Sequence, residues 1–575
     1  MKAVKATIAK ALQPVTGLDE DTLIQMLEYP PNPELGDLAL PCFKLAKTLR
    51  KNPAEIAQTL AEALVQTPAV AAAEPAGGFL NISLARLPFA NEIVNVGAVD
   101  THALFSSDRN KGHKAAVDYS SPNIAKPFGV GHLRSTIIGE SIVRLMREDG
   151  YEVVGINHLG DWGTQFGKTI AAYLKWGDEA TVRADPVREL FKLYVRFHEE
   201  AERDPALEDE GRYWFKQLED GNEQAVSLWQ WFIDESLKAF KQTYALLNVS
   251  FDHYLGESFY NDKMDAVVEE LIAAKLLVED AGAEVVDLSA YDMPPCIIKK
   301  SDGTSIYATR DLAAAAYRHD KLGADTLIYV VGGEQRLHFQ QLFKVLELMG
   351  KPYANRAQHV SFGMMKFNGA RLSTRRGHVV YLEDVLAKAI DEAQKIIEEK
   401  NPNLANKDAV ATSVGVGAVV FNDLKTYRIH DVDFRYEDVL NFDGETGPYV
   451  QYTHARACSV LRKSNEGEET MRLDMNALGG DDEGANALND SEWALVLQLA
   501  QANEALNRAV DEYDPSVMAR YTLQLCHAFN RFYHHNPILQ SESVQRTRRL
   551  AMTLATRNVL ARALYLIGMD APNEM

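Results

Sequence analysis

Apolar residues recur at helical spacing directly after a loop rich in proline and glycine. The residues with this spacing are Leu133, Ile137, Ile138, Ile142, Leu145 and Met146. They predict a helix that opens at Gly131-His132 and ends at Gly150. The apolar run 115–117 before the loop predicts a strand. A strand, a tight loop and a helix in this order present backbone N–H groups and the helix dipole to an anion. We therefore expect a phosphate site at the start of this helix.

Strand-like runs alternate with helical runs between about residue 110 and residue 380, as at 151–156 and 326–331. This alternation predicts a Rossmann-like parallel sheet with helices on both faces and ligands at the carboxyl ends of its strands. A helical insertion lies around 180–260, and the pattern is wholly helical from residue 485. We therefore predict an α/β fold with a small α/β domain at 1–107, the parallel-sheet domain at 108–445 and an all-α domain at 446–575.

The composition of the 575-residue chain is typical of a large soluble enzyme. Hydrophobic residues make up 46% of it, but no apolar stretch approaches the ~20 residues of a membrane helix. The N-terminus lacks the continuous apolar segment of a secretory signal. The four cysteines lie far apart without a C-x-x-C pair, which argues against a zinc knuckle or a disulfide framework. These features predict a cytoplasmic protein with no membrane partner and no bound zinc.

The net charge of −21 is unfavourable for non-specific binding to nucleic acid. A folded RNA needs only a local basic track, since charges beyond about 8–10 Å are screened at physiological salt. Two groups of arginines could supply it, and they are Arg371, Arg375 and Arg376, and Arg546, Arg548, Arg549, Arg557 and Arg562. The second group is equally compatible with an ordinary solvated helix face.

Residues 120–136, Ser-Ser-Pro-Asn-Ile-Ala-Lys-Pro-Phe-Gly-Val-Gly-His-Leu-Arg-Ser-Thr, resemble the HIGH motif of class I aminoacyl-tRNA synthetases and its flanks in the arginyl enzymes. The resemblance implies that ATP is bound by this segment and by a later strand end. The residues it assigns to ATP are Pro122, Gly129, Val130, Gly131, His132, Gly363 and Met364. The family usually has histidine at the first motif position, where this chain has Gly129. Glycine cannot donate a hydrogen bond to a phosphate through a side chain, so the two-histidine mechanism does not carry over.

A second phosphate-handling element is implied by Arg371-Leu372-Ser373-Thr374-Arg375-Arg376-Gly377, which is similar to the mobile KMSKS loop of the family. Taken alone, this segment is more typical of a basic surface turn, and the presence of the first motif favours the functional interpretation. Thr374 replaces the second lysine of the motif, and Lys126, just before the first motif, is implied to substitute for it. The catalytic residues implied by the resemblance are therefore His132, Lys126, Arg371, Ser373 and Arg375.

Recognition of an arginine side chain requires acceptors, because guanidinium is a planar fork of five donors. Asp118 follows the predicted strand, and Tyr307 and Asp311 are spaced i, i+4, which places them on one face of a helix. The resemblance implies that these three hold the substrate side chain, and that Asn123 and Gln335 hold its amine and carboxylate. Family members usually have glutamate at position 118, and in isolation Tyr307 and Asp311 could be an ordinary helix N-terminal pair.

The resemblance extends over the whole chain, including the loop 157–167, the junction 442–456 and the helical C-terminus. It implies an ATP-dependent arginine–tRNA ligase that forms arginyl-adenylate, uses ATP with Mg²⁺, depends on bound tRNA for activation and works as a monomer. The N-terminal domain would contact the outer corner of the tRNA, or be only a structural addition, and the C-terminal domain would bind the anticodon. Two alternatives are an RNA-binding protein that has lost catalysis and a nucleotidylyltransferase with a HIGH-like fold.

Overall fold

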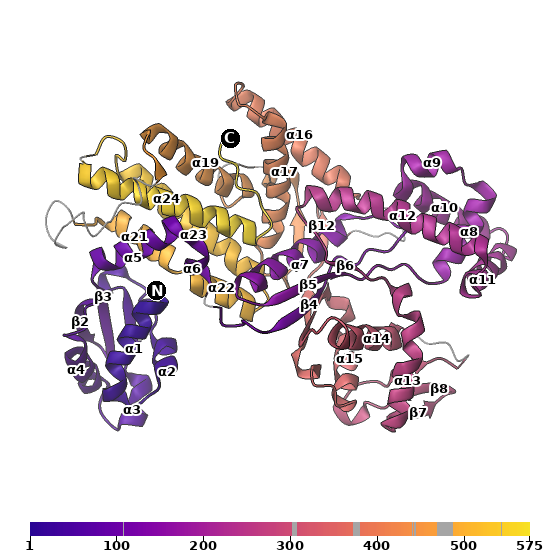
Figure 1. The fold of residues 1–575 in the computed structure, drawn as a ribbon, viewed down its shortest axis with the longest axis horizontal. Coiled ribbons are helices and arrows are strands. Elements are labelled where there is room, and N and C mark those ends of the chain that lie inside the picture. The colour runs from indigo at the N-terminus through magenta and orange to yellow at the C-terminus, as the bar shows by residue number, and fades with distance from the viewer. Residues whose placement is uncertain are drawn as a thin grey trace.

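The computed structural model describes residues 1–106, 108–301, 307–371, 380–439, 441, 444–468, 487–541 and 543–575. Three units follow one another along the chain (Figure 1). A small α/β unit is followed by a central unit around a parallel sheet, and the chain ends in a helical bundle that lies against both.

The N-terminal unit is built on a three-stranded antiparallel sheet in the order β1-β3-β2. Strand β3 alternates in burial and points Leu80, Ile82 and Leu84 into the core. The strands are β1 (Leu38–Pro41), β2 (Val70–Ala76) and β3 (Phe79–Leu84). The helices are α1 (Lys2–Thr16), α2 (Glu20–Met26), the 3-10 helix η1 (Pro33–Leu35), α3 (Phe43–Leu49) and α4 (Pro53–Leu64). The next two helices, α5 (Arg86–Val99) and α6 (Thr101–Phe105), lie against the C-terminal bundle (Figure 1).

The central unit contains a five-stranded parallel sheet in the order β11-β10-β4-β5-β6. In register, Ala116 of the middle strand lies between Val154 and Leu327. The strands are β4 (Lys114–Asp118), β5 (Glu152–Asn157), β6 (His253–Tyr254), β10 (Thr326–Gly332) and β11 (Ala357–Phe362), and the helices beside them are α7 (Val130–Glu148), α14 (Tyr307–Asp320) and α15 (Arg336–Leu348). The predicted α/β fold with a parallel sheet is confirmed.

Two excursions leave this sheet. Between β5 and β6 the chain forms a helical lobe at the right of Figure 1, with α8 (Thr164–Trp176), α9 (Glu179–Ala184), α10 (Pro186–Ala201), α11 (Ala206–Glu219) and α12 (Glu223–Leu246), the last of which runs back to the central unit. Between β6 and β10 it forms a second small sheet, β7 (Leu277–Asp280), β8 (Ala283–Val286) and β9 (Cys296–Lys299), with η2 (Glu257–Lys263), α13 (Met264–Ala273) and η3 (Ser289–Tyr291). The first excursion begins earlier than the predicted insertion, at Thr164.

A third small sheet joins the central unit to the helical bundle, in the order β13-β12-β14. Its strands are β12 (Met365–Phe367), β13 (Ala370–Arg371) and β14 (Val432–Phe434), and the 3-10 helices η4 (Gly333–Gln335) and η5 (Ala354–Arg356) precede them. The helices that follow are α16 (Leu382–Lys400), α17 (Lys407–Leu424), α18 (Tyr436–Val439), α19 (Gly447–Ser464), α21 (Asp490–Ala500), α22 (Ala502–Asp511), α23 (Pro515–His535) and α24 (Ser543–Leu566).

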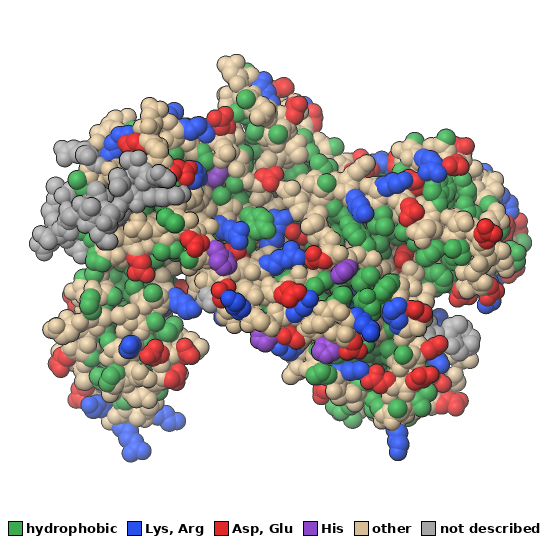
Figure 2. All heavy atoms as spheres, in the orientation of Figure 1, with side chains coloured by type: hydrophobic (Ala, Val, Ile, Leu, Met, Phe, Trp, Pro, Cys, Tyr) green, Lys and Arg blue, Asp and Glu red, His purple; other side chains and the backbone are tan. Residues whose placement is uncertain are grey.

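The C-terminal arginines form neither a free basic track nor a solvated face. Arg548 and Arg549 are buried and both contact Glu492, at 3.4 Å and 2.8 Å. The other three pair with acidic residues, and the pairs are Arg546–Glu466, Arg557–Glu468 and Arg562–Glu148. Figure 2 shows acidic and basic side chains interspersed over the visible face. None of the helices in the described ranges is both long enough and apolar enough to span a bilayer.

Candidate functional site

A cavity of about 600 Å³ opens at the carboxyl ends of β4 and β10. It is lined by all five residues that the sequence assigned to arginine and by Gly131 and His132. These five residues come from separate segments and are Asp118, Asn123, Tyr307, Asp311 and Gln335. Tyr307 and Asp311 occupy the first two turns of α14, as their spacing predicted. The fold therefore brings the candidate amino-acid residues and the candidate phosphate residues to one place.

His132 lies in the first turn of α7 and faces this cavity. Its backbone N–H donates to the Gly129 carbonyl at 2.9 Å, and its ring lies beside Phe128 with centroids 5.5 Å apart. Burial lowers the pKa of His132 to about 4, and Lys126 acts in the same direction. Its Nδ1 atom is buried and has no hydrogen-bond partner among the described residues. The imidazole is therefore neutral at pH 7 and has an unused ring nitrogen.

The remaining residues assigned to ATP hold the edges of the site and do not line the cavity. The Pro122 carbonyl accepts from Gly160 N–H, and Val130 N–H donates to Val380. Gly129 precedes α7 in extended backbone, with φ −83°, and pairs with Tyr381. In the turn after β11, Gly363 N–H donates to the Arg428 carbonyl and Met364 N–H to Asp431 Oδ1, both at 2.9 Å.

Only part of the predicted KMSKS-like element can be located. The backbone of Arg371 closes β13, which pairs with β12. The Arg371 side chain and residues Ser373 and Arg375 lie outside the described residues. Lys126, in the loop before α7, places its ammonium 5.8 Å from the centre of the Tyr194 ring.

Asp118, which the resemblance assigned to the substrate guanidinium, lines the cavity and also has an internal partner. Its Oδ2 accepts from Arg318 Nη2 at 2.7 Å, and its Oδ1 accepts from Ser121 Oγ at 2.8 Å. Both Asp118 and Arg318 are buried. The carboxylate therefore already has an internal guanidinium partner. Arg318 was missed, although its spacing of seven residues from Asp311 puts both on one face of α14.

Two further residues of the cavity, His338 and Glu257, were also not identified from the sequence. His338 Nε2 lies 2.6 Å from Asp311 Oδ2 and orients that carboxylate. Glu257, at the start of η2, lines the cavity with its Oε2 3.3 Å from Arg310 Nη1. Burial raises the pKa of Glu257 to about 7; Arg310 opposes this rise, and the charge of Asp311 adds to it. Asp311 and Glu257 thus form a pair of acidic acceptors that no local spacing in the sequence connects.

The loop 157–167, singled out in the sequence, positions these residues. Asp161 accepts from Ser258 N–H at 2.8 Å and Ser258 Oγ at 2.7 Å, which fixes the turn that carries Glu257. A Cβ on Gly256 would lie 2.2 Å from Asp161 Oδ2, and one on Gly160 would lie 2.2 Å from Asn123 Oδ1. Glycine at position 160 lets the loop approach Asn123, and glycine at position 256 lets the turn before Glu257 approach Asp161.

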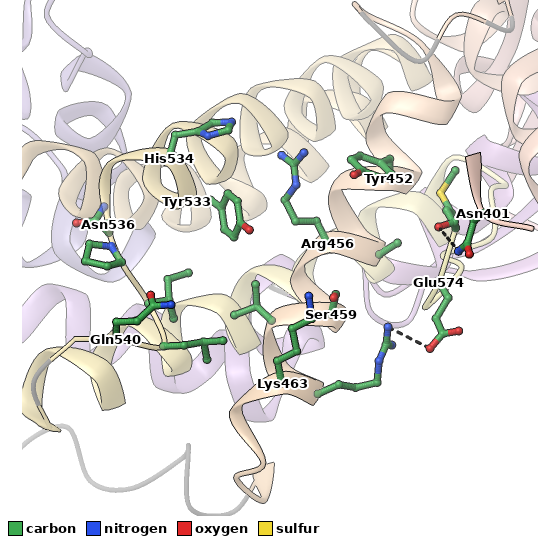
Figure 3. A pocket seen from close by; sticks show the side chains of 17 residues that line it. Asn401, Tyr452, Arg456, Ser459, Lys463, Tyr533, His534, Asn536, Gln540 and Glu574 are labelled. Carbon is green, nitrogen blue, oxygen red and sulfur yellow. Dashed lines mark hydrogen bonds and ion pairs between the residues drawn. The ribbon is translucent and has the colours of Figure 1, made fainter. Parts of the chain in front are cut away.

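A second cavity, of about 730 Å³, lies in the helical bundle between α19, α23 and the C-terminal residues (Figure 3). The Arg456 guanidinium lies between two tyrosines, 5.0 Å from the ring centre of Tyr452 and 5.3 Å from that of Tyr533. Phe529 and Phe532 are buried in the bundle, whereas Tyr533 is exposed at the cavity. The cavity thus offers a cation and aromatic faces to a ligand.

The described residues contain no group of three or more histidine, cysteine or acidic side chains that could hold a metal ion.

Comparisons with known proteins agree with this architecture. Three family models match in succession, and they are "Arginyl tRNA synthetase N terminal domain" at residues 2–84, "tRNA synthetases class I (R), catalytic domain" at 97–436 and "DALR anticodon binding domain" at 450–575. An arginine–tRNA ligase of Exiguobacterium sp. is 49% identical over 569 residues, which is 99% of each chain. One of Alkaliphilus metalliredigens is 47% identical over 561 residues, covering 98% of this chain and 97% of the relative.

The solved structure of Thermus thermophilus arginyl-tRNA synthetase superimposes over 100% of both chains with a TM-score of 0.83 at 28% identity. The resemblance predicted from the sequence is confirmed by these matches. The chain belongs to the arginyl-tRNA synthetase family of class I aminoacyl-tRNA synthetases.

Proposed function

We propose that the protein ligates L-arginine to its tRNA at the expense of ATP. The observation that carries the proposal is one cavity that holds Asp311 and Glu257 beside His132 at the N-terminus of α7. In the first step, an oxygen of the arginine carboxylate attacks the α-phosphorus of ATP, and the bond to the leaving pyrophosphate breaks. In the second, the 2′-hydroxyl of the terminal adenosine attacks the adenylate carbonyl, loses its proton, and AMP leaves.

Asp311 and Glu257 are the proposed acceptors of the substrate guanidinium. His338 holds the Asp311 carboxylate from one side, which leaves Asp311 Oδ1 for the ligand. Asp118 also lines the cavity and is proposed as a third acceptor, held in place by its ion pair with Arg318. Tyr307, which is 68% exposed, covers the mouth, and Asn123 and Gln335 bind the amine and carboxylate. A neutral analogue is rejected because it leaves partly buried carboxylates without a cation.

ATP, taken as its Mg²⁺ complex, is a substrate that binds at the start of α7. A Cβ on Gly131 would meet no described atom within 4 Å, so this position leaves room for the nucleotide. The neutral His132 donates a ring N–H to a phosphate oxygen whose charge grows as pyrophosphate leaves. We assign the flanking residues Pro122, Gly129, Val130, Gly363 and Met364 to shaping this edge, and Lys126, Arg371, Ser373 and Arg375 to the phosphates on the strength of the family motif.

The tRNA is the proposed ligand of the helical bundle. Unpaired bases stack on Tyr452 and Tyr533, with Arg456 between them, at about 1–3 kcal/mol per base. We propose that the N-terminal unit contacts another part of the same tRNA. The protein acts as a monomer in the cytoplasm. Sedimentation of the free protein and of its tRNA complex tests the monomeric state.

The test is arginine-dependent exchange of pyrophosphate into ATP, with tRNA present. Asp311→Asn removes one acceptor charge and should raise the KM for arginine by up to about a hundredfold, because a hydrogen bond to a charged group is worth about 1.5–3 kcal/mol. The KM for ATP should stay within twofold. Asp265→Asn, at an exposed position on α13, is the matched control and should leave both constants unchanged.

Citrulline in place of arginine should support no exchange. Equal use of both, or an unchanged arginine KM in Asp311→Asn, would remove the acceptor assignment. Absence of exchange with every tRNA would favour the RNA-binding alternative.

A further inference from the structure

Arg134 is fully buried on α7, two residues after His132, and the mechanism does not use it. Its Nε lies 2.9 Å from Asp423 Oδ2 of α17, which is also buried. Its two terminal nitrogens donate to three main-chain carbonyls, those of Gly363 at 2.7 Å, His430 at 2.8 Å and Arg428 at 3.2 Å. A buried guanidinium is retained only with such complete pairing. Arg134 therefore ties α7 to three other segments at once.

The Gly363 carbonyl belongs to the turn between β11 and β12. This turn leads through β12 and β13 into the KMSKS-like segment at 371–377. The turn is closely packed, because a Cβ on Gly363 would lie 2.5 Å from the His430 carbonyl oxygen. Arg134 therefore holds the helix that carries His132 at a fixed distance from the strands that carry the second phosphate-handling element.

Arg428 extends the connection into the helical bundle. Its carbonyl accepts from Arg134 and from Gly363 N–H. Its side chain donates to the Ser361 carbonyl of β11 at 2.6 Å, and to the carbonyls of Tyr513 at 3.0 Å and Glu512 at 3.3 Å. The last two form the turn between α22 and α23. One side chain thus bridges the central sheet and the bundle.

Helix α23 continues from this turn to the second cavity. It begins at Pro515, two residues after Tyr513, and ends at His535. Its last turn presents Tyr533 and His534 to the cavity in which we place tRNA bases. A helix of 21 residues spans about 30 Å, so α23 joins the cavity at Tyr533 to the turn that Arg428 contacts.

We infer that Arg428 and Arg134 are positioning residues that link occupation of the second cavity by tRNA to the geometry of the ATP-binding edge. The inference rests on the proposed function. In this arrangement, bound tRNA shifts α23, the carbonyls of Glu512 and Tyr513 shift the Arg428 side chain, and Arg134 transmits the shift to Gly363 and α7. Nothing in the connection touches Asp311 or Glu257, so arginine recognition is independent of it.

The test is a double-mutant cycle on the aminoacylation kcat at saturating tRNA. Arg428→Met keeps the aliphatic stem and removes the donors, and it should lower kcat about tenfold with the tRNA Kd and the arginine KM within twofold. Tyr533→Ala should also lower kcat at saturating tRNA in the wild-type background. In the Arg428→Met background, Tyr533→Ala should have no further effect on kcat, because the connection is already broken.

Arg508→Met is the matched control. Arg508 lies on α22 and pairs with the side chain of Glu512, within the bundle alone. Arg508→Met should leave kcat unchanged. In the Arg508→Met background, Tyr533→Ala should lower kcat by the same factor as in the wild type. Thermal melts check folding, and if Arg428→Met melts below the assay temperature, Arg428→Lys replaces it, because lysine cannot reach both domains at once.

Multiplicative effects of Arg428→Met and Tyr533→Ala would overturn the inference and leave the two arginines a purely structural role. So would an unchanged kcat in Tyr533→Ala at saturating tRNA. Both results require an active wild-type enzyme, so they differ from failure of the proposed function, in which wild-type protein charges no tRNA with arginine.

Discussion

Glu257 is a residue in the candidate site whose charge changes near neutral pH. Burial raises its pKa to about 7, so the ionised fraction of Glu257 rises through the neutral range. The substrate guanidinium is charged throughout the neutral range. The ionised form of Glu257 attracts it, and the protonated form does not.

The first prediction is therefore that the KM for arginine falls about tenfold between pH 6 and pH 8, as the fraction of ionised Glu257 rises. Arginine-dependent exchange measured across this range tests it, with the KM for ATP as internal reference. Glu257→Gln should have a high arginine KM that does not change with pH. If the KM for arginine still falls with rising pH in Glu257→Gln, another group is responsible for the pH dependence.

His132 has the opposite behaviour, because burial lowers its pKa to about 4. It stays neutral across the working range and serves as a hydrogen-bond donor. We predict that His132→Ala lowers the kcat of exchange by about 10²–10³, the usual cost of removing one preorganised donor. The arginine KM should stay within twofold, and the melting temperature should not fall below that of the wild type by more than a few degrees. An inflection near pH 6.5 that disappears in His132→Ala would contradict the neutral assignment.

At the scale of elements, the position of α7 on the sheet decides where His132 lies. Gly139 is the contact point, because a Cβ there would lie 2.3 Å from the Tyr119 Cβ. Tyr119 is itself fixed, since its hydroxyl donates to Glu140 at 2.8 Å. Any side chain at 139 must push the helix away from the strand end.

We predict that Gly139→Ala destabilises the protein by about 1–3 kcal/mol, the usual cost of overpacking, and lowers the exchange kcat. Gly131→Ala on the same helix is the matched control, because its Cβ meets no described atom within 4 Å. It should leave the free energy of unfolding unchanged or raise it slightly, since alanine favours helix over glycine. Denaturant unfolding of both variants tests this, and equal stability of the two would remove the packing argument.

Elements defined by local patterns could be predicted from the sequence, and contacts between distant segments could not. The start of α7 lies one residue from the predicted position, and the i, i+4 spacing of Tyr307 and Asp311 became one helix face as expected. The pairing of Asp118 with Arg318 joins residues 200 apart, and no periodicity reports it. The same holds for the C-terminal arginines, whose spacing resembled a solvated face although Glu492 and other distant acids pair with them.

At the scale of the molecule, the N-terminal unit docks on the helical bundle. Glu504 of α22 is the centre of this contact, since it accepts from Tyr29 Oη at 2.7 Å and pairs with Lys5 Nζ at 2.9 Å. Nearby, Trp493 Nε1 donates to Asp37 Oδ1 at 2.7 Å. Two units that we assign to the same tRNA are therefore held in a fixed relation to each other, and in Figure 1 the N-terminal unit lies apart from α14 and α15.

The last prediction concerns this docking. Glu504→Ala removes both contacts and should raise the tRNA KM severalfold, because the two units then lose their preset spacing and the tRNA must order them. The arginine and ATP constants in exchange should stay within twofold at saturating tRNA. Glu512→Ala is the control, since the Glu512 side chain pairs with Arg508 of the preceding helix α22, a contact worth about 0.3–0.5 kcal/mol. Aminoacylation kinetics over a range of tRNA concentrations measure the effect. A tRNA KM that changes equally in both variants would mean that the docking of the N-terminal unit does not serve tRNA binding.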